Sequence, residues 1–275
     1  MGNVEVRPLT AAIGAEIHGV DLRQPLDPAD LDQVNAALRD HLAVFFRDQP
    51  LAPEELIAFG RQLGALEIHP FAPSHPDHRE IVHLDQVNPV GEGADNWHAD
   101  ATFQPKPPGA AVLQAIVVPP VGGDTCFANM QAAFEALSAP VQELLENLRG
   151  VNDLSMTLAS AIEHEYSSDD LREMQKSWPP VEHPVVRSHP VTGRKAIFVN
   201  GNFTVRLAGL TIAESERLLG FLFAHVRSPR FQCRFRWEVH SIAVWDNRCV
   251  QHFGVPDYLE RRVMHRLNLA GEAPV

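Results

Sequence analysis

The first quarter of the chain alternates between helical and strand-like spacing of its apolar residues. Behind Asp27 and Pro28, apolar side chains recur at helical intervals, and an aspartate followed by a proline is typical of a helix start. The apolar run at 43–48 then indicates a buried strand. A second helix is expected to begin at Pro53, and Gly64 is placed to end it.

The middle of the chain is richer in strand signals. Segments 81–85 and 109–118 are dominated by apolar and β-branched residues and predict strands, and the Pro- and Gly-rich segment 119–124 predicts a turn. Asn129 and Ser138 are polar residues that can each cap a short helix. Strands and helices are therefore interleaved here.

Segment 151–183 has no clear hydrophobic period and is largely polar. Long irregular segments in compact domains are often functional. Two interpretations stay open: a surface loop, which the polarity favours, and a lid over a site.

The C-terminal third returns to short strands. Segment 185–199 predicts a hairpin with its turn at Thr192 and Gly193, and Thr211 with Glu214 forms a capping box at the head of a helix. Three more strands are expected at 231–238, 241–247 and 261–271. Because no repeat, low-complexity tract or interdomain linker is visible, we expect residues 1–275 to form a single mainly β domain with flanking helices.

Composition narrows the function classes. The 275 residues are 45% hydrophobic and 21% charged, which is typical of a globular protein. The net charge of −12 disfavours general binding to nucleic acid, because an acidic chain repels phosphate backbones. Three cysteines without CxxC spacing indicate free thiols, and neither a signal peptide nor a membrane span is apparent. We therefore expect a cytoplasmic protein that binds neither nucleic acid nor membrane.

One short segment carries candidate metal ligands. His98 and Asp100 are two residues apart, and residues at this spacing on a strand point to the same face. Two histidines and one carboxylate on one face of an octahedron are the arrangement of non-haem Fe(II) oxygenases. By itself His-x-Asp is a common pattern, and it needs a third ligand. His252 is the candidate, if antiparallel strands bring it beside the pair.

A second set of polar side chains occupies the predicted C-terminal strand. Arg262 and Arg266 would share one face of that strand, with His265 on the other. Arginine suits a carboxylate or sulfonate because it grips the anion through two parallel hydrogen bonds. Most other histidines, His75 and His78 among them, show no partner pattern and are expected at surface or packed positions.

The ordered set of motifs resembles the taurine dioxygenase family of Fe(II)/2-oxoglutarate-dependent dioxygenases, which also includes 2,4-dichlorophenoxyacetate dioxygenase. The resemblance covers most of the chain, through IGAEIHGVDL (13–22), FFRDQ (45–49), LEIHP (66–70), NWHAD (96–100), GGDT (122–125), HPVVRSHPVTGRKAIFVN (183–200), WDNRCVQH (245–252) and DYLERRVMHR (257–266). It implies a double-stranded β-helix, that is, a jelly roll with helices packed outside, and a homo-oligomer, either a dimer or a tetramer.

The resemblance also implies roles for individual residues. His98, Asp100 and His252 would hold Fe(II), and Arg262 with Thr125 would bind the distal carboxylate of 2-oxoglutarate. Dioxygen would be the third reactant, and hydroxylation of the substrate would release succinate and CO2. The residues implied at the substrate are His69 and Arg266 at its acidic group and Phe203 in the pocket wall.

Departures from the family pattern bear on the substrate. Taurine-cleaving members carry a Tyr where this chain has Ala72 and an Asn where it has Ala94, and a Ser-Phe pair corresponds to Thr157-Leu158. Two methyl groups leave the taurine ammonium without a partner, which is costly in a partly dry pocket. We therefore expect a small acidic substrate with a less polar tail, such as an alkylsulfonate, a sulfate ester or a carboxylate. The alternatives are taurine itself, a jelly-roll metal hydrolase and a non-enzymatic binding protein.

Overall fold

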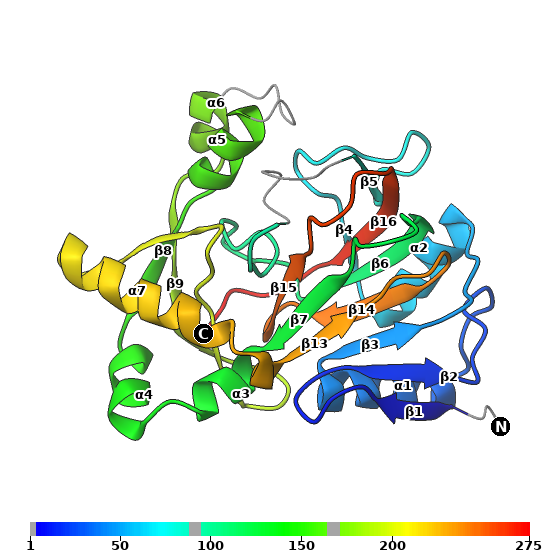
Figure 1. Cartoon of the computed structure of the whole chain (residues 1–275), viewed down its shortest axis with the longest axis horizontal. Helices are drawn as coiled ribbons and strands as arrows, with labels where there is room; N and C mark the ends of the chain where they lie inside the picture. Colours follow the sequence, from blue (N-terminus) through cyan, green and yellow to red (C-terminus); the bar gives the residue numbers. More distant parts are fainter. Residues whose placement is uncertain (1–3, 88–94, 164–170) are drawn as a thin grey trace.

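The computed structural model describes residues 4–87, 95–163 and 171–275 (Figure 1). The largest sheet is mainly antiparallel. Among its described strand pairs, β2 and β3 are the parallel pair. Its strands follow the order β1 (Glu5–Pro8), β2 (Ala15–His18), β3 (Ala43–Phe46), β14 (Ile242–Asp246), β6 (Ala110–Val117), β16 (Arg262–Leu269) and β4 (Leu66–Glu67), with β5 (Val82–Gln86) also paired to β16.

Shorter sheets make up the rest of the β structure. One of them faces the large sheet across the core and consists of β13 (Gln232–Phe235), β7 (Thr125–Asn129) and β15 (Val250–Gly254). Another contains β12 (Thr204–Leu207), β8 (Arg149–Asn152) and β9 (Val181–Pro184), and a hairpin joins β10 (Val186–Ser188) to β11 (Lys195–Ile197). The expected mainly β jelly roll with flanking helices is confirmed.

The helices begin largely where the sequence places them. The Asp27 side chain accepts a hydrogen bond from the Asp30 backbone amide, and the capping box between Thr211 and Glu214 is present. Ser138 lies at a helix start, but its side chain makes no capping hydrogen bond. The helices are α1 (Pro28–His41), α2 (Pro53–Leu63), α3 (Met130–Glu135), α4 (Ala139–Glu146), α5 (Ser155–Glu163), α6 (Leu171–Ser177) and α7 (Ile212–Val226), with a 3-10 turn at Pro229–Phe231.

Strand β3 shows how alternation divides the core in two. Phe45 points between the sheets, where its ring stacks on Phe235 at 4.1 Å between centroids and meets the edge of Phe127. Phe46 points the opposite way and packs against Phe59 of α2. The large sheet is therefore buried on both faces, by the second sheet on one side and by α1 and α2 on the other.

Segment 151–183 differs from the favoured prediction of a surface loop. It contains the end of β8, helices α5 and α6, and the start of β9. Leu154 and Leu158 are buried there, in contact with Phe103 and Phe203. Packing against these aromatic rings stabilises helical structure that the weak hydrophobic period of the segment does not predict. Strands β1, β2, β7 and β12 were not predicted either.

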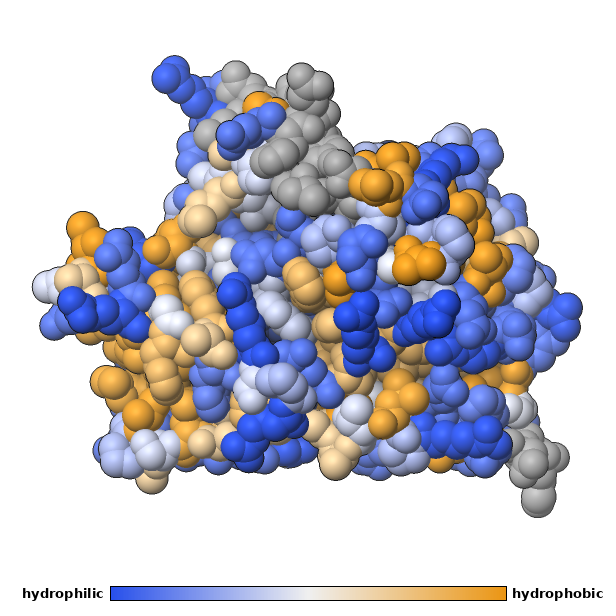
Figure 2. Space-filling model, in the orientation of Figure 1, coloured by the Kyte–Doolittle hydropathy of each residue, from blue (hydrophilic) through white to orange (hydrophobic). Residues whose placement is uncertain are grey.

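The surface agrees with the composition. Polar and apolar side chains are interspersed over the face in Figure 2, and apolar colour gathers over α4 and α7 at its left. Within the described ranges, we find no helix with both the length and the apolarity that a membrane crossing requires.

Replacing Phe45 tests the contact between the two sheets. We expect Phe45→Ala to lower the free energy of unfolding by about 3–5 kcal/mol, since it leaves a cavity among fully buried rings. The exposed Phe221 of α7 is the matched control, and Phe221→Ala is expected to change stability by about 0.5 kcal/mol or less. Equal losses in urea denaturation would contradict the two-sheet core.

Candidate metal centre

His98 and His252 are joined through their backbones. The His98 amide donates to the His252 carbonyl at 3.0 Å, and the His252 amide donates to the His98 carbonyl at 2.8 Å. This isolated antiparallel bridge sets the two rings 4.1 Å apart between centroids. The bridge therefore brings together two histidines that are distant in the sequence, as the expected strand pairing required.

Asp100 reaches the same point through a turn and not through a continuous strand. Only His98 of this segment is in a β-bridge, and Ala101 has a positive φ of 49°. Asn247 holds the turn from both sides, since its side chain accepts from the Asp100 amide at 2.7 Å and donates to the Asp100 carbonyl at 3.0 Å. The expectation of a shared strand face is wrong in its geometry, although the side chains converge.

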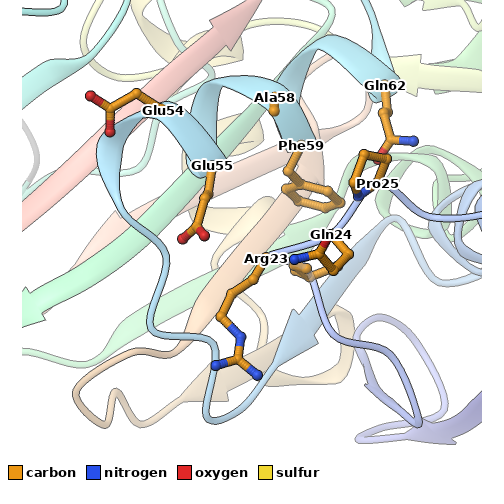
Figure 3. Close-up of a pocket in the computed structure, with 9 residues that line it drawn as sticks. Arg23, Gln24, Pro25, Glu54, Glu55, Ala58, Phe59 and Gln62 are labelled. Atoms are coloured by element: carbon orange, nitrogen blue, oxygen red, sulfur yellow. The ribbon is translucent and has the colours of Figure 1, made fainter.

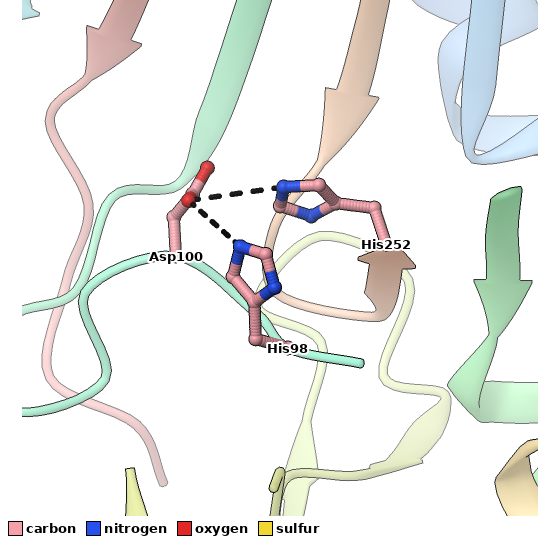
Figure 4. Close-up of side chains that lie close together, drawn as sticks. All are labelled: His98, Asp100 and His252. Atoms are coloured by element: carbon pink, nitrogen blue, oxygen red, sulfur yellow. Dashed lines mark ion pairs between the residues drawn. The ribbon is translucent and has the colours of Figure 1, made fainter. Parts of the chain in front are cut away.

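The three side chains form a compact donor set (Figure 4). The Nε2 atoms of His98 and His252 lie 3.6 Å and 3.9 Å from Asp100 Oδ1. The Nδ1–H of His98 donates to the Asn96 carbonyl at 2.8 Å, which leaves the Nε2 lone pair facing Asp100. A second hydrogen bond of this kind is how proteins orient a histidine that binds a metal.

The electrostatics of the set suit a divalent cation. Burial opposes ionisation of Asp100, but Arg266 and the two imidazoles outweigh it and hold the pKa of that carboxyl below its usual range. Burial, together with His98, lowers the pKa of His252 to about 3, so this imidazole is neutral near pH 7 and keeps a lone pair. Within the described residues, Asp100 Oδ2 is buried without a hydrogen-bond partner. Two imidazoles and one carboxylate fit a transition metal.

Among the residues that the structure describes, one other group places three potential ligands close together, namely His189, Asp246 and Cys249. The ligand atoms of His189 and Asp246 in this group are engaged in hydrogen bonds that stabilise the fold. His189 Nε2 donates to Asp246 at 2.9 Å, while its Nδ1 accepts from backbone amides. Asp246 also accepts a bidentate pair from Arg248. These bonds occupy the lone pairs that a metal would need, so the group braces the turn before β15.

The two arginines of β16 lie on its inner face, as predicted. Arg266 Nη1 donates to Asp100 Oδ1 at 3.0 Å, which places a guanidinium directly beside the donor set. Arg262 is buried, with its guanidinium carbon 5.9 Å from the Trp237 ring and 6.0 Å from the Tyr258 ring. A side chain at Gly123 would come within 3.2 Å of Arg262, so this glycine leaves room for the guanidinium.

Thr125 and Arg262 are connected through Trp237. The indole Nε1–H of Trp237 donates to Thr125 Oγ1 at 2.9 Å, and the ring lies next to Arg262. Thr125 and Arg262, the two residues expected at 2-oxoglutarate, therefore both lie next to the Trp237 ring. Trp237 was not predicted as a site residue, because its position beside Thr125 follows from the pairing of β13 with β7.

His69 lies within electrostatic reach of Arg266 and Asp100. Burial, followed by the nearby Arg266 charge, lowers the pKa of His69 to about 3. The Ala72 amide donates to His69 Nδ1 at 2.9 Å, so the backbone fixes the ring and the Nε2 side carries the hydrogen. Arg266 and a neutral N–H donor therefore lie near one another, as the sequence analysis expected for an acidic group.

An apolar cluster adjoins this polar set. Phe203 and Leu158 both belong to it, together with Ala101, Phe103 and Leu154, and Met174 and Trp178 pack against it. The ring of Phe103 lies at the centre, 5.4 Å from Phe203, 5.6 Å from Trp178 and 5.6 Å from Phe71. Phe103 and Trp178 were not predicted as site residues. Ala94 lies outside the described residues.

A surface hollow between segment 22–25 and α2 offers no comparable chemistry (Figure 3). Its polar side chains are engaged locally. Arg23 pairs with Asp21 at 2.7 Å, Glu55 accepts from the Ala52 amide, and Gln62 bonds to the backbone of Leu26. The 98/100/252 group is therefore the stronger candidate site.

Comparisons with known proteins agree with this geometry. Residues 5–268 match the family model described as "Taurine catabolism dioxygenase TauD, TfdA family". The chain is 37% identical to an alpha-ketoglutarate-dependent sulfate ester dioxygenase of Pseudomonas putida, over 99% of this chain and 91% of the relative. A crystal structure of a taurine dioxygenase from Burkholderia xenovorans superposes with a TM-score of 0.85 and 36% identity, covering 99% of this chain and 91% of that one.

A further solved structure, AAD-2 in complex with Mn(II) and N-oxalylglycine, gives a TM-score of 0.83 at 30% identity and covers 99% of both chains. The matches extend over the whole fold and are not limited to the motifs. The chain belongs to the TauD, TfdA family and is an alpha-ketoglutarate-dependent dioxygenase.

Proposed function

We propose that this enzyme uses Fe(II) and O2 to hydroxylate a small acidic substrate with an apolar tail, with release of succinate and CO2 from 2-oxoglutarate. The observation that carries the proposal is the convergence of His98, Asp100 and His252 on one point. These three residues would hold the metal ion. When bound, Fe(II) supplies the activation of dioxygen that drives the oxidative decarboxylation and the hydroxylation.

The 2-oxoglutarate site is proposed at Arg262 and Thr125. A dianion needs a positive partner, and Arg262 is a buried cation on the same face of β16 as Arg266. The Trp237 ring shields this region from water, which strengthens the attraction between the guanidinium and a carboxylate. The Thr125 hydroxyl accepts from Trp237, so its own hydrogen is available for a carboxylate oxygen.

The acidic group of the substrate is proposed at Arg266 and His69. Arg266 lies 3.0 Å from Asp100, so an anion held by Arg266 places its neighbouring carbon close to the metal ligands. His69 contributes a neutral N–H and no second charge, because burial keeps its pKa near 3. The work of these side chains is to orient the target C–H and to exclude water.

The tail of the substrate is proposed to lie along the apolar cluster around Phe103. Aromatic rings extend from Phe71 beside His69 through Phe103 to Trp178, which directly follows α6. This wall offers contact area to an alkyl or aryl group, but its side chains carry no oxygen that could accept a hydrogen bond from an ammonium. The relative from Pseudomonas putida acts on sulfate esters by its name, which supports this substrate class.

Family membership sets aside the metal hydrolase and the non-enzymatic binding protein. Taurine stays as the alternative substrate. Several expectations from the sequence stay predictions. They are the single domain over 1–275, the lid role of α5 and α6, the dimer or tetramer, the cytoplasmic location, and the absence of nucleic-acid and membrane partners. Exposed Leu144 and Ile212 on α4 and α7 support an interface between copies of the chain.

A substrate panel tests the proposed class. With Fe(II) and 2-oxoglutarate present, we expect hexyl sulfate and hexanesulfonate to support faster O2 uptake and succinate release than taurine. The physical reason is that Ala72 gives the taurine ammonium no partner. Faster turnover of taurine than of every alkyl anion would reject the substrate proposal. O2 uptake that does not depend on 2-oxoglutarate would reject the role of 2-oxoglutarate as cosubstrate.

Neighbouring arginines give a matched test of the cosubstrate site. We expect Arg262→Gln to raise the KM for 2-oxoglutarate roughly 100-fold, because a charge-assisted contact of about 3 kcal/mol is lost. Arg261 points outward and pairs with Asp85 at 2.6 Å, so Arg261→Gln should leave this KM nearly unchanged. Similar effects of the two substitutions would argue against a carboxylate at Arg262.

Trp178 tests the tail position. In Trp178→Ala we expect kcat/KM to fall roughly 10-fold or more for hexyl sulfate and by much less for methyl sulfate, since only the longer chain reaches the removed ring. Met156 of α5 is exposed and supplies the control Met156→Ala. An equal loss for both substrates would mean that Trp178 stabilises the fold of α6 and does not contact the tail.

A further inference from the structure

A group of histidines lies on the opposite face of β16 from the two arginines. We call His75, His78, His83 and His265 the histidine cluster. His265 alternates with Met264 and Arg266, which face the interior, and it therefore points outward with Leu267, which packs under α2. From the sequence, His75 and His78 were expected at surface or packed positions and His265 on the face of its strand opposite the arginines, while His83 carried no prediction of its own.

Backbone pairing places three of these imidazoles on adjacent chain segments. His83 of β5 lies directly opposite His265 of β16 in the antiparallel register. Segment 73–75 pairs with the other edge of β5, since the His83 amide donates to the Pro73 carbonyl and the His75 amide donates to the Ile81 carbonyl, both at 2.8 Å. Three neighbouring segments thus present one imidazole each to the same face.

The rings are close enough to share an ion. His265 Nε2 and His83 Nδ1 are 3.2 Å apart, and the His75 ring lies 5.3 Å from the His265 ring between centroids. Two nitrogens bound tetrahedrally to Zn²⁺ at about 2.0–2.1 Å are roughly 3.3 Å apart. The two rings are hydrogen-bonded to each other at nearly this separation, so Zn²⁺ bound between them would displace the proton that they share.

The surroundings favour a cation. Glu54 of α2 lies 3.2 Å from His78 Nε2, and Asp85 lies 3.9 Å from His83 Nε2. Burial, with His83 and His75 nearby, lowers the pKa of His265 to about 4, so this ring is neutral near pH 7. Asp85 also pairs with Arg261 at 2.6 Å, so that guanidinium is neutralised by the same carboxylate.

The third ligand has to move to complete such a site. Within the described residues the cluster is not among the groups with three ligand atoms inside 4.8 Å of one another. His75 is half-exposed on the 68–81 segment, and its Nδ1 accepts only a 3.2 Å bond from the Asp77 amide. A three-histidine site would require this one side chain to rotate so that one of its nitrogens approaches the pair.

We propose that His75, His83 and His265 form a second metal site that takes a divalent ion of the imidazole-preferring class, with Zn²⁺ as its representative. The site is separate from the 98/100/252 group, because His265 and Arg266 point to opposite faces of β16. Zn²⁺ bound there ties the 68–81 segment, which also carries His69, to the strand that carries Arg266. The ion is structural, since the cluster lies on the far side of β16 from the proposed substrate.

Zinc titration in a variant without the first site tests the proposal. In His98→Ala/His252→Ala, calorimetry should still detect one equivalent of Zn²⁺. Adding His83→Ala or His75→Ala should weaken this binding at least about 10-fold, because each change removes one imidazole. The matched control is His18→Ala on β2, a half-exposed histidine outside the cluster, which should leave the affinity unchanged.

Hydrogen exchange locates the ion independently. Zn²⁺ should slow exchange of the backbone amides of 75–83 in the His98→Ala/His252→Ala protein and should have no such effect once His83 is replaced. Absence of Zn²⁺ binding in the double variant would overturn the proposal. So would binding that persists unchanged in the His83→Ala and His75→Ala variants, since the ion would then lie elsewhere.

Discussion

Two backbone hydrogen bonds between His98 and His252 are the constraint on which the site depends. They join the segment before Ala101 to β15, and they fix the separation of two imidazoles before any metal is present. Asn247 adds the third ligand by holding both backbone groups of Asp100, from a position 147 residues further along the chain. Hydrogen bonds to the main chain therefore position the three ligand side chains.

Strand β16 extends this logic to the rest of the site. Its alternation directs Arg262 and Arg266 towards the interior of the jelly roll, where Met264 lies between them in the core. The same alternation sends Leu267 against α2 and His265 against His83. A slip of one residue in the pairing with β6 and β5 would exchange these faces and remove both arginines from the site. The buried contacts on both faces specify the register.

Much of this was predictable from the sequence because the chemistry resides in short motifs. His98, Asp100, His252 and the β16 arginines were all expected, and the structure brings the first three together with Arg266. The jelly roll was expected from the family resemblance. The local pattern predicted the strand that became β14, and the capping box at Thr211 predicted α7.

Other features depend on contacts between distant segments and leave little local signal. Asn247 holds Asp100, and nothing in its own segment of the sequence indicates this contact. Phe103 and Trp178 form one wall only because the 154–178 segment packs against Phe103 and Phe203, and this packing turns an aperiodic segment into helices. The histidine cluster arises from β-pairing between β5 and β16 and has no linear motif at all.

The most direct test of the central claim is a crystal structure of the enzyme grown without oxygen in the presence of Fe(II) and 2-oxoglutarate, with data collected at the iron absorption edge. The account predicts one strong anomalous peak within about 2.0–2.3 Å of His98 Nε2, His252 Nε2 and an Asp100 oxygen, with a keto acid reaching from it towards Arg262. A peak at His189, Asp246 and Cys249, or none at the 98/100/252 group, would contradict it.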